Sequence, residues 1–276
     1  MPDITEKQLK AGIAARYASL RRVGALKPEI IGKRLQQGIE AQQAVLRQLA
    51  TRPSTPIFIA LNTPFLIWPN RFLPNSTDPL GTNILVDSHV EPLNNWAKIL
   101  LNFSQDDAIF ATDRLNFYFL WKNDTGGDVV VNITSSLTLI GSCKVHAKSS
   151  FWHGLAAPNF SQVSIDAVLS VFEWWNQPPT EPLPETSQTQ NVTSLSAKGG
   201  VWSDDGRSKI FSGNFPVAYN SFHIPSGNVG VFEVGVSLNW GLVAGDVNVD
   251  FSFQNNIIQC PSLSLEVFTA TAKKTV

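Results

Sequence analysis

The hydrophobic pattern divides this chain near Pro56. Before this proline, apolar residues recur every three or four positions, and after it they alternate with polar residues. The first spacing places side chains on one face of an α-helix, and the second places them on one face of a β-strand. The sequence therefore predicts a helical arm over residues 1–55 and a β-rich body over residues 56–276.

Two helices are predicted in the arm. Thr5 and Gln8 have the spacing of a capping box at the start of the first helix. Ile4 and Leu9 have the spacing of a hydrophobic staple, and Pro28 suits the first turn of a second helix. The apolar positions at helical spacing are Leu9, Ile13, Tyr17, Leu20, Ile31, Leu35, Ile39 and Leu46. We expect this stripe to pack on the β body or on a partner subunit.

The body contains many short segments with strand periodicity. The clearest runs over residues 232–240 and another over residues 247–253, each with one apolar and one polar face. Residues 116–121 are apolar on both faces, which predicts a central strand covered on each side. Short strands without helices between them predict a mainly β fold, an antiparallel β-sandwich or jelly roll. The proline-rich stretch 176–190 is expected to be a surface connection within one sandwich, with two β domains as the alternative.

Turn sequences separate several of these segments. Residues 123–128 and 203–206 contain Asp and Gly in the order that favours a hairpin connection, and residues 225–228 contain Pro and Gly. We therefore expect antiparallel neighbours on either side of residues 123–128 and of residues 203–206.

Composition agrees with a soluble β-rich protein. Hydrophobic residues make up 43% of the chain and charged residues 16%, with 17 Phe and 8 Trp. The first ten residues are mostly polar, so we expect no N-terminal signal peptide, and a cytoplasmic location or release by another route. Cys143 and Cys260 fall at apolar positions of strand-like runs, which favours buried free thiols over a disulfide.

Charge is unevenly distributed along the chain. The arm has ten Lys or Arg and four Asp or Glu, about +6, so the overall charge of −1 leaves about −7 on the body. The basic residues are spread along the helices and do not form a block, which argues against nucleic acid as a partner. Attraction between the arm and a β body, in the same or a neighbouring subunit, accounts for this asymmetry more simply.

No enzyme motif is recognisable in the sequence. The four histidines lack a neighbouring nucleophile motif, and no glycine-rich phosphate loop occurs. Asp87, His89 and Glu91 alternate along one predicted strand face and are the best metal-ligand candidates, although Pro92 favours a polar loop there. We expect a non-enzymatic protein without a cofactor.

Aromatic residues are the most promising candidates for binding. Alternation over residues 163–175 turns Phe172 and Trp174 away from the core. An outward aromatic pair can stack on a sugar, contact another subunit, or receive the arm helices. Trp152 and Trp202 are further candidates for a sugar platform.

Three functional hypotheses remain open from the sequence. The leading one is a β-sandwich that acts by assembly or binding, with itself or another protein as the partner. A carbohydrate-binding module that uses the outward aromatics is the first alternative. A membrane-active or pore-forming toxin, whose arm helices insert into a bilayer, is the second.

Overall fold

The computed structural model describes residues 4–23, 56–72, 82–149, 159–174 and 186–269. Within these residues the chain forms one helix and thirteen strands. In chain order they are α1 (Glu6–Val23), β1 (Ile57–Leu61), β2 (Phe65–Phe72), β3 (Thr82–Glu91), β4 (Asn94–Gln105), β5 (Ile109–Lys122), β6 (Val129–Ala147), β7 (Phe160–Glu173), β8 (Thr186–Lys198), β9 (Asp205–Ile224), β10 (Val229–Val243), β11 (Gly245–Asp250), β12 (Ile257–Gln259) and β13 (Leu263–Thr269). The fold is thus mainly β, as the alternating pattern after Pro56 predicted.

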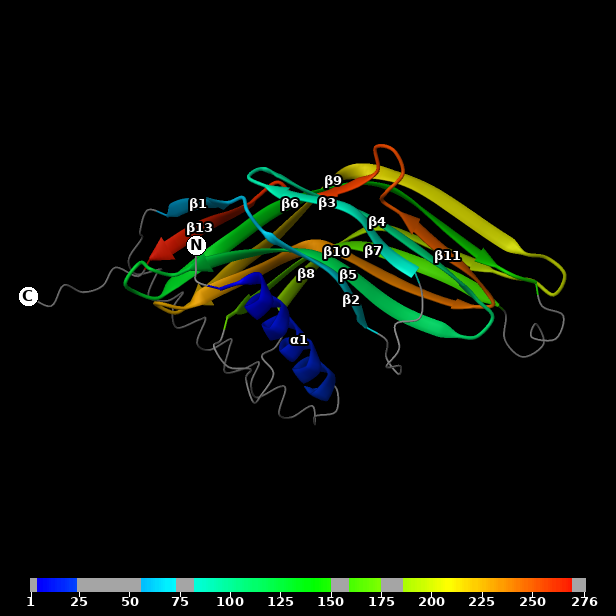
Figure 1. Ribbon diagram of the computed structural model, residues 1–276, viewed down its shortest axis with the longest axis horizontal. Coiled ribbons are helices and arrows are strands. Elements are labelled where there is room, and N and C mark those ends of the chain that lie inside the picture. The colour runs from blue at the N-terminus through cyan, green and yellow to red at the C-terminus, as the bar shows by residue number, and fades with distance from the viewer. Residues whose placement is uncertain (1–3, 24–55, 73–81, 150–158, 175–185, 270–276) are drawn as a thin grey trace, which may run out of the picture.

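The strands form two antiparallel sheets, which we call sheet A and sheet B. Sheet A has eight strands, in which β6 pairs with β9 along one edge and with β11, β12 and β13 along the other. Sheet B has five strands in the order β2-β5-β10-β7-β8. Figure 1 shows sheet A as the upper layer, sheet B below it and α1 beneath sheet B. Residues 186–190 of the predicted connection 176–190 belong to β8 and pair with β7, which differs from the prediction. Strands from before and after this stretch pair with one another in both sheets.

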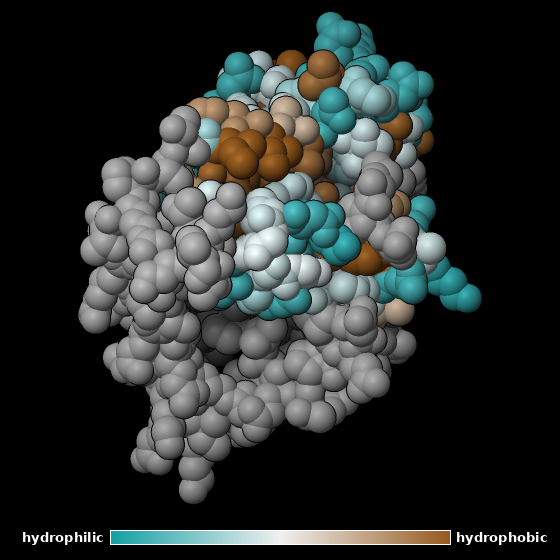
Figure 2. Space-filling view, turned by 90° about the vertical axis from the view of Figure 1, so that its left-hand side faces the viewer, coloured by the Kyte–Doolittle hydropathy of each residue, from teal (hydrophilic) through white to brown (hydrophobic). Residues whose placement is uncertain are grey.

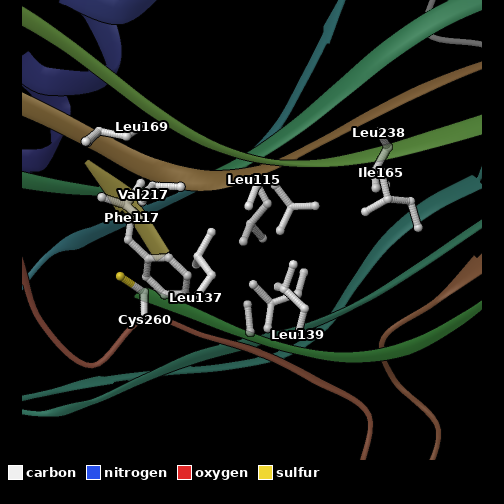
Figure 3. Close-up of a cluster of buried hydrophobic side chains, with 14 of the residues drawn as sticks. Leu115, Phe117, Leu137, Leu139, Ile165, Leu169, Val217, Leu238 and Cys260 are labelled. Atoms are coloured by element: carbon white, nitrogen blue, oxygen red, sulfur yellow. The ribbon is translucent and has the colours of Figure 1, made fainter. Parts of the chain in front are cut away.

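The hydrophobic core lies between the two sheets. Side chains such as Phe117 and Ile165 from sheet B meet Leu137 and Leu139 from sheet A (Figure 3). Each fully buried aliphatic or aromatic side chain contributes roughly 1.5–3 kcal/mol relative to an exposed one. Cys143 and Cys260 are buried in this core as free thiols, which confirms the prediction made for them.

Helix α1 begins as its sequence predicts. The Thr5 backbone N–H donates to Gln8 Oε1 at 2.8 Å, and the Gln8 N–H donates to Thr5 Oγ1 at 3.3 Å, which is a capping box. Leu9 and Ile13 are 0% and 2% exposed, because they pack on the outer face of sheet B. The first helix of the arm therefore packs on the sheet of its own chain. The predicted second helix lies outside the described residues, so only the first of the two predicted helices is supported by the described structure.

Sheet A ends at an exposed apolar edge. Strand β1 pairs with β13 and occupies one end of the strand order. Ile57 and Phe58 of β1 are 50% and 74% exposed. Figure 2 views the molecule from this end and shows hydrophobic side chains on its surface. Edge strands with apolar side chains are common sites of contact with other chains.

Two expectations about the strands were wrong. Strand β10 is buried on both faces: one face packs in the core between the sheets, and Val231 on the outer face packs against α1. Even Glu233 and Ser237 on that face are only 1% and 3% exposed. Residues 203–206 do not connect a hairpin, since β8 belongs to sheet B and β9 to sheet A. Residues 123–128 do not connect a hairpin either, because β5 belongs to sheet B and β6 to sheet A. The connections at 123–128 and 225–228 are turns between the two sheets, with Gly126 and Gly227 at positive φ.

Candidate functional site

A groove crosses the outer face of sheet B, beyond the end that α1 covers. It has a volume of about 470 Å³, and we call it the sheet-B groove. Its lining consists of Phe110, Ala111 and Thr112 of β5, Gln162, Val163 and Ser164 of β7, Ser194, Leu195 and Ser196 of β8, and Asn239 and Trp240 of β10. No residue of sheet A belongs to this lining, so the groove opens away from the core.

Strand register brings the polar side chains of the groove together. Thr112, Asn239, Ser164 and Ser194 are direct neighbours across four adjacent strands. Thr112 Oγ1 donates to Asn239 Oδ1 at 2.8 Å, and the Ser164 and Ser194 hydroxyl oxygens are 3.2 Å apart. Side chains in such a row lie about 5 Å apart on one face of the sheet, which lets each support the next.

Asp166 links this row to the next one. Its Oδ2 accepts from Asn239 Nδ2 at 2.9 Å, and its Oδ1 accepts from Asn191 Nδ2 at 2.8 Å. The register of β7 with β8 shifts by one residue just here, between Ile165 and Asp166, which places Asn191 opposite Asp166. Bulges of this kind re-aim a side chain, and Asn191 Nδ2 also reaches Ser164 Oγ at 2.9 Å. Amides and a carboxylate thus hold the array in one arrangement.

An aromatic pair forms the far end of the groove. Phe110 is 48% exposed, and its ring centroid lies 5.6 Å from that of Phe160 at an interplanar angle of 36°. Gly241 of β10 lies directly across from Phe110. A Cβ atom at Gly241 would lie 2.5 Å from Phe110 Cδ1, so the absence of a side chain there lets the ring lie across the strand. The sheet-B groove therefore combines an exposed aromatic ring with a preformed polar array.

The chemistry of this groove favours binding over a reaction. Hydroxyl and amide groups can both donate and accept hydrogen bonds, and Asp166 accepts only. Hydrolysis of a glycosidic bond requires two facing carboxyl groups, and the described groove lining contains none besides the adjacent Asp166. No nucleophile paired with a histidine occurs in that lining either.

A second pocket lies beside the start of α1. It has a volume of about 710 Å³ and lies among Ile4 and Gln8, the end of β1, and the tryptophans Trp121 and Trp174. The Trp174 ring packs on α1 at Gly12. The approach is so close that a Cβ atom at Gly12 would lie 2.4 Å from Trp174 Cη2. Trp174 belongs to the same apolar cluster as Leu9 and Ile13. Its main contact in the described structure is therefore with the helix.

The other aromatics predicted for sugar binding lie apart. Phe172 is 3% exposed beneath α1, so its ring faces are covered. Trp202 is 80% exposed in the connection between β8 and β9, near the opposite end of β7 from Trp174. At about 3.3 Å per residue, β7 separates these two ends by roughly 40 Å. Trp152 lies outside the described residues. The predicted aromatics thus do not form one platform.

The predicted metal ligands lie on β3. His89 Nε2 is 3.2 Å from Glu91 Oε2, and the His89 ring stacks on Trp96 with centroids 5.8 Å apart. Asp87 Oδ1 accepts from the Ser88 N–H at 2.8 Å. No group of three His, Cys, Asp or Glu side chains suited to a metal ion occurs in the described parts of the chain. The geometry therefore pairs His89 with Glu91 and Trp96 and does not gather all three ligands.

The remaining predicted interface residues are only partly visible. Leu9 and Ile13 make the contact of α1 with sheet B. Tyr17 and Leu20 belong to α1, but their side chains lie outside what the structure describes. Ile31, Leu35, Ile39 and Leu46 lie outside the described residues altogether.

A charged cluster joins the ends of β6 and β11 to the β8–β9 connection. His146 Nδ1 is 3.0 Å from Asp246 Oδ2, and His146 Nε2 is 3.4 Å from Asp204 Oδ2. Lys148 Nζ donates to Asp106 Oδ1 at 2.8 Å, and this hydrogen bond lowers the pKa of Asp106 and raises that of Lys148. A hydrogen bond from the Ser149 backbone lowers the pKa of Asp204. These contacts tie connections together, which is a structural role.

Sequence reasoning missed most of the groove. Alternation does turn Ser164 and Asp166 outward on β7, in the segment that also carries Trp174. Their partners, however, come from other strands: Thr112 and Asn239 are 127 positions apart, and Asn239 and Asp166 are 73 apart. No local pattern shows that these positions meet.

Comparison with known proteins adds little to this description. No protein-family model matches the chain, and no curated protein matches it in sequence. A solved structure that resembles part of it is that of TmCBM61 in complex with β-1,4-galactotriose, with 9% identity over 63% of this chain and 70% of that chain, at a TM-score of 0.21. Similarity at that TM-score carries no argument about fold or function. In the parts that the structure describes, no helix is long and apolar enough to cross a membrane.

Proposed function

We propose that this protein is a non-enzymatic carbohydrate-binding β protein and that the sheet-B groove holds the sugar. The observation that carries the proposal is the half-exposed ring of Phe110 beside a hydrogen-bonded polar array. A binding site usually combines apolar surface with a few fixed polar groups, and this groove has both.

A sugar ring matches this combination. Its C–H face can pack on the Phe110 ring, while its hydroxyl groups exchange hydrogen bonds with Thr112, Ser164 and Asn239. The array is already ordered by its own hydrogen bonds, so little side-chain freedom is lost on binding.

The other hypotheses have less support from the contacts of α1. Assembly and membrane insertion were both inferred from the apolar stripe of the arm, and its first members, Leu9 and Ile13, are buried against sheet B. The exposed edge of β1 at Ile57 and Phe58 is the described surface that still favours assembly. The mass of the full chain in solution, compared with that of a chain beginning at Pro56, tests this second candidate: two monomers exclude assembly through the arm.

A glycan array probed with the full chain tests the main proposal. For a glycan that binds, Phe110→Ala should weaken affinity by about 2- to 12-fold, which corresponds to the 0.5–1.5 kcal/mol typical of a ring-stacking contact. Asn239→Ala should weaken it further, because it removes the link between Thr112 and Asp166. Phe253→Ala is the matched control, since Phe253 is 62% exposed between β11 and β12, on sheet A.

The outcomes separate cleanly. A loss of affinity in the Phe110 and Asn239 variants, with the Phe253 variant and the unfolding midpoint unchanged, supports the groove. Equal affinity in all three variants would place any sugar elsewhere. Absence of binding to every glycan of the glycan array would refute carbohydrate binding.

A further inference from the structure

The carboxylate of Asp166 determines the charge of the polar array. Its hydrogen-bond donors in the array are the amides of Asn239 and Asn191 and the Ser164 hydroxyl at 3.4 Å, all neutral groups. Neutral donors orient a carboxylate without cancelling its charge. The array therefore presents a negative charge directly beside the lining residues Ser164 and Asn239.

Cations lie farther from the array. The described lining of the sheet-B groove contains neither Lys nor Arg. The backbone of Arg114 lies two strands away from that of Asp166 in the same row, roughly 10 Å at the usual strand spacing. Lys198 lies four residues beyond Ser194 on β8, roughly 13 Å along the strand.

The Asp166 carboxylate also retains capacity for a ligand. Each carboxylate oxygen has two lone pairs; Oδ1 accepts from Asn191 and Ser164, whereas Oδ2 accepts from Asn239 and keeps one lone pair for a ligand. A ligand hydroxyl can donate to the remaining position, whereas a ligand carboxylate or sulfate cannot. An anionic group at the same place would instead be repelled.

From this arrangement we infer that the sheet-B groove selects uncharged sugars and disfavours uronic, sialylated and sulfated ones. This inference rests on the proposed carbohydrate binding. Two like charges about 6 Å apart weaken binding by between about 3-fold in water-like surroundings and about 100-fold at a dielectric of 20. Because salt screens part of this repulsion, the preference should be at least about 2-fold at physiological salt and larger at low salt.

Matched pairs of glycans test the selection. Each pair has one backbone with and without the charge: methyl-esterified and de-esterified homogalacturonan, hydroxyethyl and carboxymethyl cellulose, and desialylated and sialylated lactosamine glycans. In every pair that the full chain binds, we expect the neutral member to bind at least about 2-fold tighter at 0.15 M salt. The ratio should increase when the salt is lowered to about 0.01 M, because the Debye length then rises to about 30 Å.

Two variants test whether the Asp166 carboxylate causes the preference for neutral sugars. Asp166→Asn removes the charge and should bring the ratio of the two affinities close to one, even if both affinities change. Glu266→Gln is the control, since Glu266 on β13 of sheet A accepts from Asn132 Nδ2 at 2.8 Å and lies outside the groove lining. That variant should keep the wild-type ratio.

Failure of the two proposals gives different results. Equal binding of charged and neutral partners by the wild type, or an unchanged ratio in Asp166→Asn, overturns the selection but leaves carbohydrate binding intact. If the protein binds neither member of any pair and no glycan of the glycan array, both proposals are overturned.

Discussion

Docking of α1 on its own sheet is the structural claim most open to direct test. Leu9 is fully buried and Ile13 is 2% exposed, both against the outer face of sheet B. Burying two such side chains contributes roughly 3–6 kcal/mol, an upper estimate because the unfolded chain is not fully extended. This contribution is comparable to the cost of one Leu→Ala change in a packed site, about 2–5 kcal/mol. Replacing Leu9 by Ala should therefore remove much of what holds α1 in place.

The expected effect is local. A loss of 2 kcal/mol raises the population of the detached helix by about 30-fold. Backbone amides of α1 should then exchange with deuterium about 30-fold faster, while those of β5 and β10 stay protected by the core. Hydrogen exchange followed by mass spectrometry measures both regions in one experiment. Lys7→Ala is the control, because Lys7 is exposed on the same helix.

Two results would refute this account of α1. Exchange in Leu9→Ala that equals exchange in Lys7→Ala would mean that Leu9 does not hold the helix. Protection of α1 that increases with protein concentration would mean that the helix packs on another copy of the chain.

Two further predictions concern the core. Gly235→Ala should lower the free energy of unfolding by about 3 kcal/mol or more, because the new Cβ would clash with the Leu115 carbonyl oxygen of the adjacent strand. Gly213→Ala is the control, because its Cβ would lie 3.4 Å from its nearest neighbours, and a urea titration of both variants should show a much smaller loss for it. Burial raises the pKa of Cys143 to about 11 and that of Cys260 to about 12, so neither thiol should react with a disulfide reagent at pH 8 until the protein unfolds. Since the unfolded thiols ionise near pH 8.5, the contribution of the two thiols to stability should be constant below that pH and should decrease as the pH rises toward 11–12. A thiol titration and urea midpoints at several pH values above 8 check both statements, and rapid reaction of the native protein would contradict them.

The sequence by itself determined the features that depend on near neighbours. The change of period at Pro56 separates α1 from the strands, and the Thr5–Gln8 capping box forms as its three-residue spacing predicts. The run 116–121 is central and mostly buried on both faces, as its continuous apolar character predicted. Cys143 and Cys260 are buried because alternation already placed them with apolar residues. Each of these features depends on residues within a few positions of one another.

The tertiary structure alone decided which surfaces remain exposed and which polar groups meet. The outer face of β10 has the polar alternation of a solvated strand, yet Val231 is buried against α1 and Glu233 is only 1% exposed, whereas Phe110 farther along the face stays half exposed. Asp166 meets Asn191 through a register shift and Asn239 through strand order, and neither is visible in local periodicity. Periodicity assigns a side chain to a face, but pairing between distant strands determines its neighbours and what covers that face.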